Sequence, residues 1–242
     1  MDRILLSIPF FILSFGATMY SAAENEWIAL FDGETLDGWE VAAKPADRDT
    51  VYWKVVDGTI TCDSRGHKEH GYVWLINQKK FKNFELKIKV RGFRNSPGNS
   101  GVQVRSRYDY REFWLDGPQV DIHPPAAWRT GLIYDETREI KRWIFPSLKN
   151  WEIDDSHAPR GWKWKFADEG DGWNDLLIIC NGTNISTFLN GVSAAELKGD
   201  GTLNDANHRR HNVGMEGHIA LQLHSGDELF VQFKDILIKT LK

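Results

Sequence analysis

The sequence predicts an all-β protein that is organised as an antiparallel β-sandwich. Apolar and polar residues alternate with a period of two in many short segments, which places the two kinds of side chain on opposite faces of a strand. Gly, Asp, Asn and Pro separate these segments, as is typical of turns between antiparallel strands. The sequence shows neither an internal repeat nor a sustained heptad, which disfavours a propeller and a coiled coil.

Residues 1–23 predict an export signal that precedes the fold. Arg3 comes before the apolar stretch Ile4–Phe15, and Ser21-Ala22-Ala23 supplies the small residues of a cleavage site. A membrane anchor is the alternative, but the apolar run is short for a spanning helix. We therefore expect one domain over residues 24–242 of an exported protein, periplasmic or secreted, with no membrane span in the mature chain.

The first part of the mature chain predicts a hairpin and a half-buried strand. Tyr52–Val56 runs through the turn dipeptide Asp57-Gly58 into Thr59–Cys62. Phe84–Arg91 then alternates without a break, so one of its faces is apolar and the other is charged. A Gly- and Asn-rich loop over residues 94–101 leads into the next strand.

The rest of the chain continues as strands, with two exceptions. Residues 137–170 break the alternation with prolines and with aromatic residues beside charges, which predicts a long loop with one short helix that shapes a site. The basic cluster His208-Arg209-Arg210-His211 predicts a solvated loop. Further strands are expected at Asp116–His123, Gly131–Tyr134, Asp175–Cys180, Ile185–Leu189, Val192–Ala194, Gly217–His224 and Phe230–Ile238.

Three of the predicted strands carry an apolar face and a polar, titratable face. They are Val102–Arg105, Gln119–His123 and Ile219–His224. In each strand the apolar residues face a core, and the Gln, Asp, Arg or His side chains face the other way. Placed in one sheet, the three strands would form a polar binding surface.

Charge and cysteine content bound the function further. The chain carries 30 basic and 34 acidic side chains, a net charge of −4, and this near balance gives no electrostatic reason to expect nucleic acid or an anionic membrane as a partner. Cys62 and Cys180 are the two cysteines, and an exported location permits a disulfide between them. Because the sequence does not give the distance between them, a disulfide and two free buried thiols both remain open.

Leu30-Phe31-Asp32-Gly33-Glu34-Thr35-Leu36-Asp37-Gly38-Trp39 resembles the opening signature of the bacterial 3-keto-disaccharide hydrolase family. The resemblance covers about residues 27–241 and implies a concanavalin A-like lectin/glucanase sandwich, a jelly roll, whose concave sheet binds a sugar. Four further stretches agree with the family: Asn99–Arg105; Gly117–Ile122 with Gly131–Glu136; Trp173–Asp175 with Leu189–Val192; and Ile219–Gly226 continuing to Ile238.

The resemblance implies a hydrolase or lyase acting on glycosides that are already oxidised to a ketone at carbon 3. The ketone acidifies the proton on carbon 2, so a base can remove it, the aglycone can leave from carbon 1, and water can then add to the unsaturated sugar. This route needs a base, a donor for the enolate oxygen and an acid for the leaving group.

The polar strands supply candidates for each role. Asp121, Glu136 and His224 can act as acid or base, and we favour Asp121 and His224 as the pair, with Arg105 as the oxyanion partner. The amides of Gln103, Gln119 and Gln222 suit sugar hydroxyls. The aromatic candidates for substrate binding are Tyr134, Trp114 and Trp128, and Trp143, Trp162 and Trp164 share the irregular segments that could line a groove.

Three alternatives stay open beside this interpretation. Gln119-Val120-Asp121-Ile122-His123 lacks the outer carboxylates of the Glu-x-Asp-x-x-Glu strand of sandwich glucanases, which disfavours ordinary two-carboxylate hydrolysis. A non-catalytic, lectin-like carbohydrate-binding module, or an interaction protein with a vestigial site, would use the same fold. No cofactor is certain, but Asp121, His123, Glu136 and His224 offer ligands for a divalent metal that would polarise the ketone.

Overall fold

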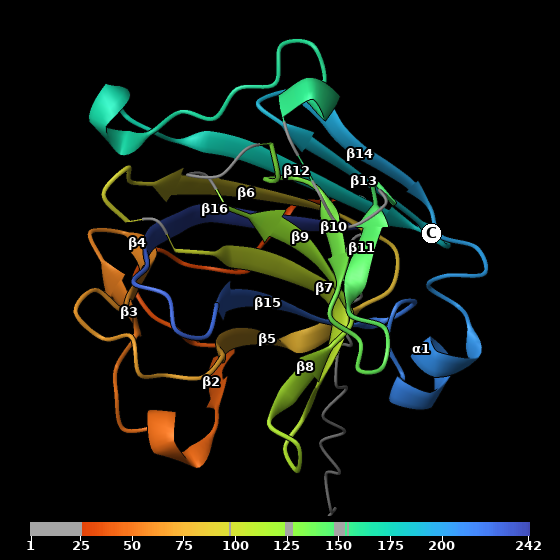
Figure 1. Cartoon of the computed structure of the whole chain (residues 1–242), viewed down its shortest axis with the longest axis horizontal. Helices are drawn as coiled ribbons and strands as arrows, with labels where there is room; N and C mark the ends of the chain where they lie inside the picture. The colour runs from red at the N-terminus through yellow and green to blue at the C-terminus, as the bar shows by residue number, and fades with distance from the viewer. Residues whose placement is uncertain (1–25, 97, 124–127, 148–152, 154) are drawn as a thin grey trace, which may run out of the picture.

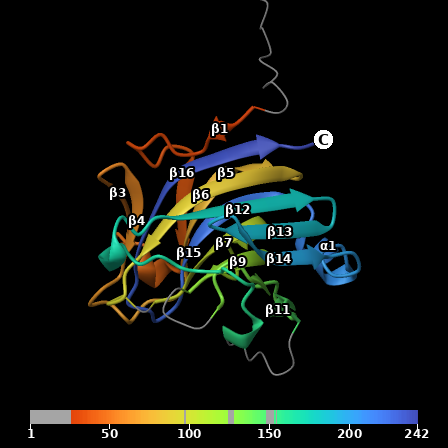
Figure 2. The ribbon, with the colours of Figure 1, turned by 90° about the horizontal axis from the view of Figure 1, so that it is seen from above.

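The computed structural model describes residues 26–96, 98–123, 128–147, 153 and 155–242. The described chain forms two antiparallel β-sheets that pack face to face, as the sequence predicts (Figures 1 and 2). The predicted signal, residues 1–23, lies outside the described residues. Within the described ranges, no helix has the length and apolar character needed to cross a membrane.

The sandwich consists of a back sheet and a front sheet. The back sheet has the order β14-β13-β12-β6-β16-β4-β3, with β1 paired to β16, and the front sheet has the order β11-β10-β9-β7-β15-β5-β2, with β8 paired to β7. The back strands are β1 (Ile28–Ala29), β3 (Trp53–Val56), β4 (Thr59–Asp63), β6 (Phe84–Gly92), β12 (Asn174–Asn181), β13 (Asn184–Leu189), β14 (Val192–Lys198) and β16 (Phe230–Thr240). The front strands are β2 (Trp39–Ala43), β5 (Val73–Phe81), β7 (Ser100–Asp109), β8 (Trp114–Asp116), β9 (Pro118–Ile122), β10 (Ile133–Asp135), β11 (Arg142–Phe145) and β15 (Gly217–Leu223).

The predicted alternation places the core between the sheets. Val102 and Val104 of β7 and Ile88 of β6 are fully or almost fully buried in one apolar cluster that draws on both sheets. The predicted hairpin is present, since Val56 pairs with Thr59 across the turn. Both turn residues, Asp57 and Gly58, have positive φ angles of 47° and 72°, as the tightest hairpin turns require.

The cysteines lie too far apart in the back sheet to pair. Cys62 is on β4 and Cys180 is on β12, with β16 and β6 between these two strands. Both thiols are free and buried. The structure thereby decides between the two alternatives that the sequence left open.

Two segments differ from the sequence-based prediction. Residues 137–170 contain strand β11 in addition to the short helical turns η3 (Asp155–His157) and η4 (Ala167–Glu169). The basic cluster is not a solvated loop, because it forms most of helix α1 (Ala206–His211). The His208 ring is fully buried, with Nδ1 2.9 Å from Asp205 Oδ1 and Nε2 3.2 Å from Asp135 Oδ2. These two carboxylates bind the ring inside the protein, and for this reason the segment is not the solvated loop that its charge predicts.

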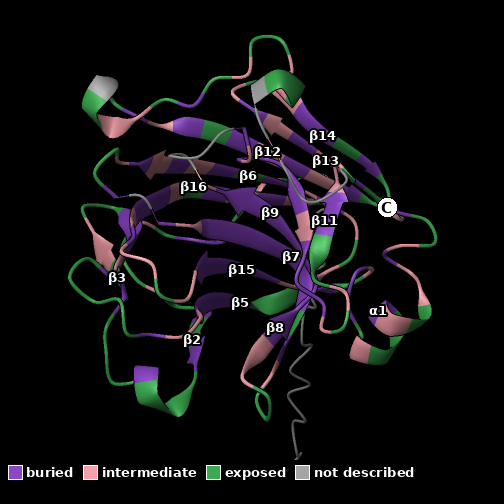
Figure 3. Ribbon diagram, in the orientation of Figure 1, coloured by how far each residue is buried: buried purple, intermediate pink, exposed green. Residues whose placement is uncertain are grey.

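The polar face of the front sheet is covered instead of open to solvent. Strands β7, β9 and β15 are buried almost throughout (Figure 3). On this face Trp74, Tyr108 and Leu115 form a second apolar cluster, in which β8 contributes Leu115 and closes over the sheet. The covering leaves a pocket at one side of the face, and the candidate site lies there.

Candidate active site

Three buried side-chain amides form the floor beneath the site; Gln119 lines the pocket, whereas Gln103 and Gln222 do not. The strand register pairs Gln103 of β7 with Gln119 of β9, and their amides lie 2.5 Å apart. The same atom of the Gln103 amide lies 3.1 Å from Gln222 Nε2 and 3.2 Å from Trp74 Nε1. The three glutamines predicted to bind substrate are therefore together, and they hold one another in place.

A glycine creates the space for this floor. Gly101 pairs with Asp121 across β7 and β9. A Cβ atom at Gly101 would lie 2.4 Å from Cδ of Gln119, closer than real Cβ contacts. Gln119 can fold over the strand because position 101 has no side chain.

Asp121 is a buried carboxylate with one cationic neighbour. It is 1% exposed, its Oδ1 accepts from Gln119 Nε2 at 3.4 Å, and its Oδ2 lies 3.3 Å from Arg129 Nε. Burial raises the pKa of Asp121 to about 6, while Arg129 and the Gln119 amide oppose that rise. Asp121 is thus mostly ionised at neutral pH and more basic than an exposed aspartate.

Glu136 follows the end of β10 and is also buried. Its Oε1 accepts from Gln222 Nε2 at 3.4 Å, and its main-chain oxygen accepts from Trp114 Nε1 at 2.8 Å. Burial raises the pKa of Glu136 to about 7, with Gln222 and Lys141 acting in the opposite direction. At neutral pH this group can therefore either give or take a proton.

His224 follows β15 and is held as one tautomer. Its Nδ1 lies 3.1 Å from the main-chain oxygen of Ser225, and its Nε2 lies 2.9 Å from the hydroxyl of Tyr72. Because a carbonyl only accepts, we assign the ring proton to Nδ1, so Nε2 accepts from Tyr72. Burial lowers the pKa of His224, and the ring is therefore neutral at pH 7.

These groups converge on one pocket of about 220 Å³. This volume is small beside the roughly 300–1,000 Å³ of pockets for drug-sized ligands, and it suits a single sugar ring. The aromatic rings and the titratable groups both face it. The lining consists of Tyr72, Asn99, Trp114, Gln119, Asp121, Arg129, Tyr134, Glu136, Lys141, Trp143 and His224.

Arg105 was assigned to this site from the sequence, and that prediction was wrong. Its φ angle of 50° marks a break in the alternation of β7. The guanidinium, fully buried, donates instead to the main-chain oxygens of Lys82 at 2.6 Å and Gly182 at 2.7 Å. The arginine that lies beside Asp121 is Arg129.

The other predicted residues divide between pocket and core. Tyr134 and Trp114 line the pocket, as does Trp143. Trp128 is 4% exposed and packs with Leu132 and Trp143, so it belongs to an apolar cluster beside the pocket. Trp164 lies in the main core, Trp162 packs at the edge of both clusters, and His123 does not line the pocket.

Sequence reasoning missed several members of the pocket. Arg129 and Lys141 lie in irregular segments, where no periodicity gives a direction to a side chain. Tyr72 and Asn99 immediately precede the strands β5 and β7, and that position next to a strand end is the one signal that could have indicated them. Within the described parts of the chain, no group of three or more His, Cys, Asp or Glu side chains is placed to hold a metal ion.

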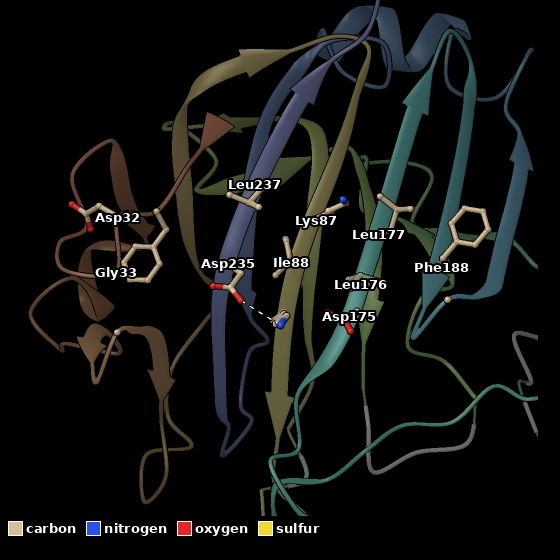
Figure 4. A pocket seen from close by; sticks show the side chains of 14 residues that line it. Asp32, Gly33, Lys87, Ile88, Asp175, Leu176, Leu177, Phe188, Asp235 and Leu237 are labelled. Atoms are coloured by element: carbon tan, nitrogen blue, oxygen red, sulfur yellow. Dashed lines mark ion pairs between the residues drawn. The ribbon is translucent and has the colours of Figure 1, made fainter. Parts of the chain in front are cut away.

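A larger hollow lies on the outer face of the back sheet, away from these groups (Figure 4). It measures about 700 Å³, and its floor includes Leu177 and Leu237. The charge of Asp235 is matched by Lys89, at 3.6 Å. Its three aspartates are exposed, so burial does not prepare them for acid–base chemistry. The smaller pocket on the front sheet is therefore the better candidate active site.

Solved structures with the same fold come from carbohydrate-related proteins. Two provisionally named glycosyl hydrolases from Parabacteroides distasonis ATCC 8503 are 18% and 20% identical, with TM-scores of 0.56 and 0.54; this chain is covered over 89% and 90%, and those chains over 94% and 100%. The carbohydrate-binding module CBM66 from Bacillus subtilis is 12% identical, with a TM-score of 0.50, over 84% of this chain and 96% of the module. At such identities the similarity shows the fold alone.

The sequence itself carries the family assignment. No curated protein matches the chain. Residues 26–239, which include every residue of the pocket, match the 3-keto-α-glucoside-1,2-lyase-like domain. The chain therefore belongs to the family of 3-keto-α-glucoside-1,2-lyase-like domains.

Proposed function

We propose that the protein cleaves 3-keto-glycosides by removing the proton on carbon 2 and eliminating the aglycone from carbon 1. One observation carries this proposal: two buried carboxyl groups, Asp121 with a pKa of about 6 and Glu136 with a pKa of about 7, line one pocket together with the cation Arg129. The family assignment and the carbohydrate-related proteins that share the fold support a role on sugars.

Asp121 is the base in the first step. It takes the proton from carbon 2, and the electron pair of that C–H bond forms a C2=C3 double bond as the ketone becomes an enolate. Arg129, whose Nε lies 3.3 Å from Asp121, stabilises the negative charge on the enolate oxygen. Desolvation of Asp121 strengthens it as a base.

Glu136 is the acid in the second step. The enolate reforms the C3 ketone, a C1=C2 double bond forms, and the C1–O bond breaks as Glu136 gives its proton to the leaving oxygen. With a pKa of about 7, Glu136 is about half protonated at neutral pH. His224 is less suited to this role, because its one ring proton is bound by the Ser225 carbonyl.

Hydration completes the reaction by the reverse proton transfers. Water adds to carbon 1, ionised Glu136 accepts its proton, and Asp121 returns a proton to carbon 2. The net result is a free 3-keto-sugar and an aglycone alcohol, and both carboxyl groups regain their starting states.

The test uses 4-nitrophenyl 3-keto-glucoside and its unoxidised parent in D₂O. We expect release of nitrophenolate from the keto compound alone and one deuterium at carbon 2 of the released sugar, above the exchange seen without protein. Asp121→Asn should abolish the release, whereas Asp175→Asn, an exposed carboxylate of the back sheet, should not. Glu136→Gln should slow cleavage of an alkyl 3-keto-glucoside far more than that of the nitrophenyl compound, because nitrophenolate leaves without a proton. Equal cleavage of the parent compound would contradict the elimination route, whereas a product without deuterium would show that Asp121 returns the same proton before it exchanges with solvent.

A non-catalytic carbohydrate-binding module is the second candidate function. Gln119, the amide of the floor that lines the pocket, favours it, since an amide binds hydroxyls without taking part in proton transfer. Tight binding of the keto compound without release of nitrophenolate would favour this function. A parallel assay with a chelator tests the divalent-metal alternative, because loss of release that is restored by added metal requires a metal.

We also propose that the protein acts after export. Arg3, the apolar stretch Ile4–Phe15 and Ser21-Ala22-Ala23 support this placement. N-terminal sequencing of the protein recovered from the periplasm or medium should give a chain that begins near Glu24. Recovery of full-length chain in the cytoplasm alone would contradict it.

A further inference from the structure

Asn99 lies between the strands that carry the titratable groups of the pocket. It directly precedes β7, whose first residue, Ser100, pairs with Ile122 at the end of β9. On the other side, His224 donates its main-chain N–H to the oxygen of Asn99 at 3.3 Å. Asn99 therefore faces the pocket from between Asp121 of β9 and His224.

The backbone of Asn99 is fixed from two directions. Its N–H donates to Asp227 Oδ2 at 2.7 Å, in addition to the bond that its oxygen accepts from His224. The preceding Gly98 packs so closely that a Cβ there would lie 2.8 Å from Cβ of Leu229. The side chain of Asn99 is consequently presented from a rigid support, as a residue that selects a ligand requires.

The side-chain oxygen of Asn99 has no hydrogen-bond partner among the described residues, although the atom is buried. A buried acceptor without a partner is costly, so a ligand that donates a hydrogen bond is expected to satisfy it. A neutral amide oxygen suits a hydroxyl group better than it suits an anion.

We propose that Asn99 is a specificity-determining residue that accepts a hydrogen bond from the hydroxyl on carbon 4 or carbon 6 of the sugar being cleaved. The inference rests on the proposed function. A 3-keto-glucosyl unit carries hydroxyls on carbons 2, 4 and 6. In the proposed reaction carbon 2 lies next to Asp121, which removes its proton, so the hydroxyl on carbon 2 is not the one assigned to Asn99. An amide neither gives nor takes a proton in the reaction, so its contribution is to binding, equally in the ground state and the transition state.

The experiment is a cycle of wild-type protein and Asn99→Ala against the 3-keto-glucoside and its 4-deoxy and 6-deoxy analogues. For one analogue, wild-type kcat/KM should fall about tenfold, mainly through KM, with no further fall in Asn99→Ala. For the other analogue, kcat/KM should fall by the same factor in wild type and in Asn99→Ala. Asn184→Ala, an exposed amide on β13, is the matched control and should behave as wild type.

The outcomes separate this inference from the proposed function. If wild-type protein does not turn over the parent 3-keto-glucoside, the proposed function fails. If wild type is active but each analogue lowers kcat/KM by the same factor in wild type and in Asn99→Ala, the inference alone fails. Circular dichroism and a thermal unfolding scan of Asn99→Ala check that the variant is folded, and Asn99→Asp, which keeps the acceptor oxygen, should retain the discrimination if Asn99→Ala is unstable.

Discussion

Asp121→Asn should stabilise the protein at alkaline pH while abolishing its activity. The pKa of Asp121 is about 6 in the folded protein, against an ordinary value of 3.8, so the folded state binds this proton more tightly than the unfolded state. The free energy of unfolding therefore falls as pH rises from about 4 through 6. The two pKa values differ by about 2, which corresponds to about 3 kcal/mol that the ionised carboxylate removes from stability at pH 8.

Urea unfolding of wild type and Asp121→Asn at pH 4, 5, 6, 7 and 8, at constant ionic strength, measures this effect. The difference in unfolding free energy should grow in favour of the variant by about 3 kcal/mol between pH 4 and pH 8. Taking the difference removes every other titration that the two proteins share. For the control Asp175→Asn, exposed on the back sheet, the difference should stay within about 0.5 kcal/mol. A difference for Asp121→Asn that is flat, or that shrinks with rising pH, would refute the argument.

Three further substitutions test other parts of the structure. Gly101→Ala places a Cβ 2.4 Å from Gln119 Cδ, so we expect urea unfolding to show a loss of about 1–3 kcal/mol and kinetics to show a raised KM; a silent substitution would show that the floor is not tightly packed. Arg105→Met leaves several main-chain oxygens without donors, and the unfolding free energy should fall by about 3 kcal/mol or more while kcat per folded molecule is retained. Arg129→Gln should lower kcat by about 10²–10³ with little change in KM, whereas a change confined to KM would contradict its role at the enolate.

The alternation of residues was sufficient to predict most of the sandwich and the polar face of three strands. It did not indicate β5, because Val73, Trp74, Leu75 and Ile76 form a continuous apolar run. Odd members of this run face the main core and even members face the second apolar cluster, so both faces of the strand are buried. A run of this kind has the same pattern whether it is a buried strand or a buried helix segment.

The site was predicted in part, and the errors have local physical causes. Asp121 and Gln119 follow the regular pleat of β9, so the sequence pattern gave their face correctly. Arg105 sits at a residue with positive φ, and a single such break reverses the direction of a side chain without any mark in the pattern. Arg129 reaches Asp121 from an irregular segment, a contact that depends on tertiary structure alone.

The covering of the front sheet connects the stability of the protein to its proposed chemistry. An open polar face, as the alternation alone suggested, would leave Asp121 hydrated and only weakly basic. Trp114, Tyr72 and the neighbouring rings line the pocket beside these groups, and burial raises the pKa of Asp121 and of Glu136. Burial destabilises the folded protein when these carboxyl groups are ionised. The same burial makes Asp121 a stronger base and keeps Glu136 partly protonated, so that it can act as an acid. Substitutions that open this cover should therefore lower the pKa of both carboxyl groups toward their ordinary values and lower activity together.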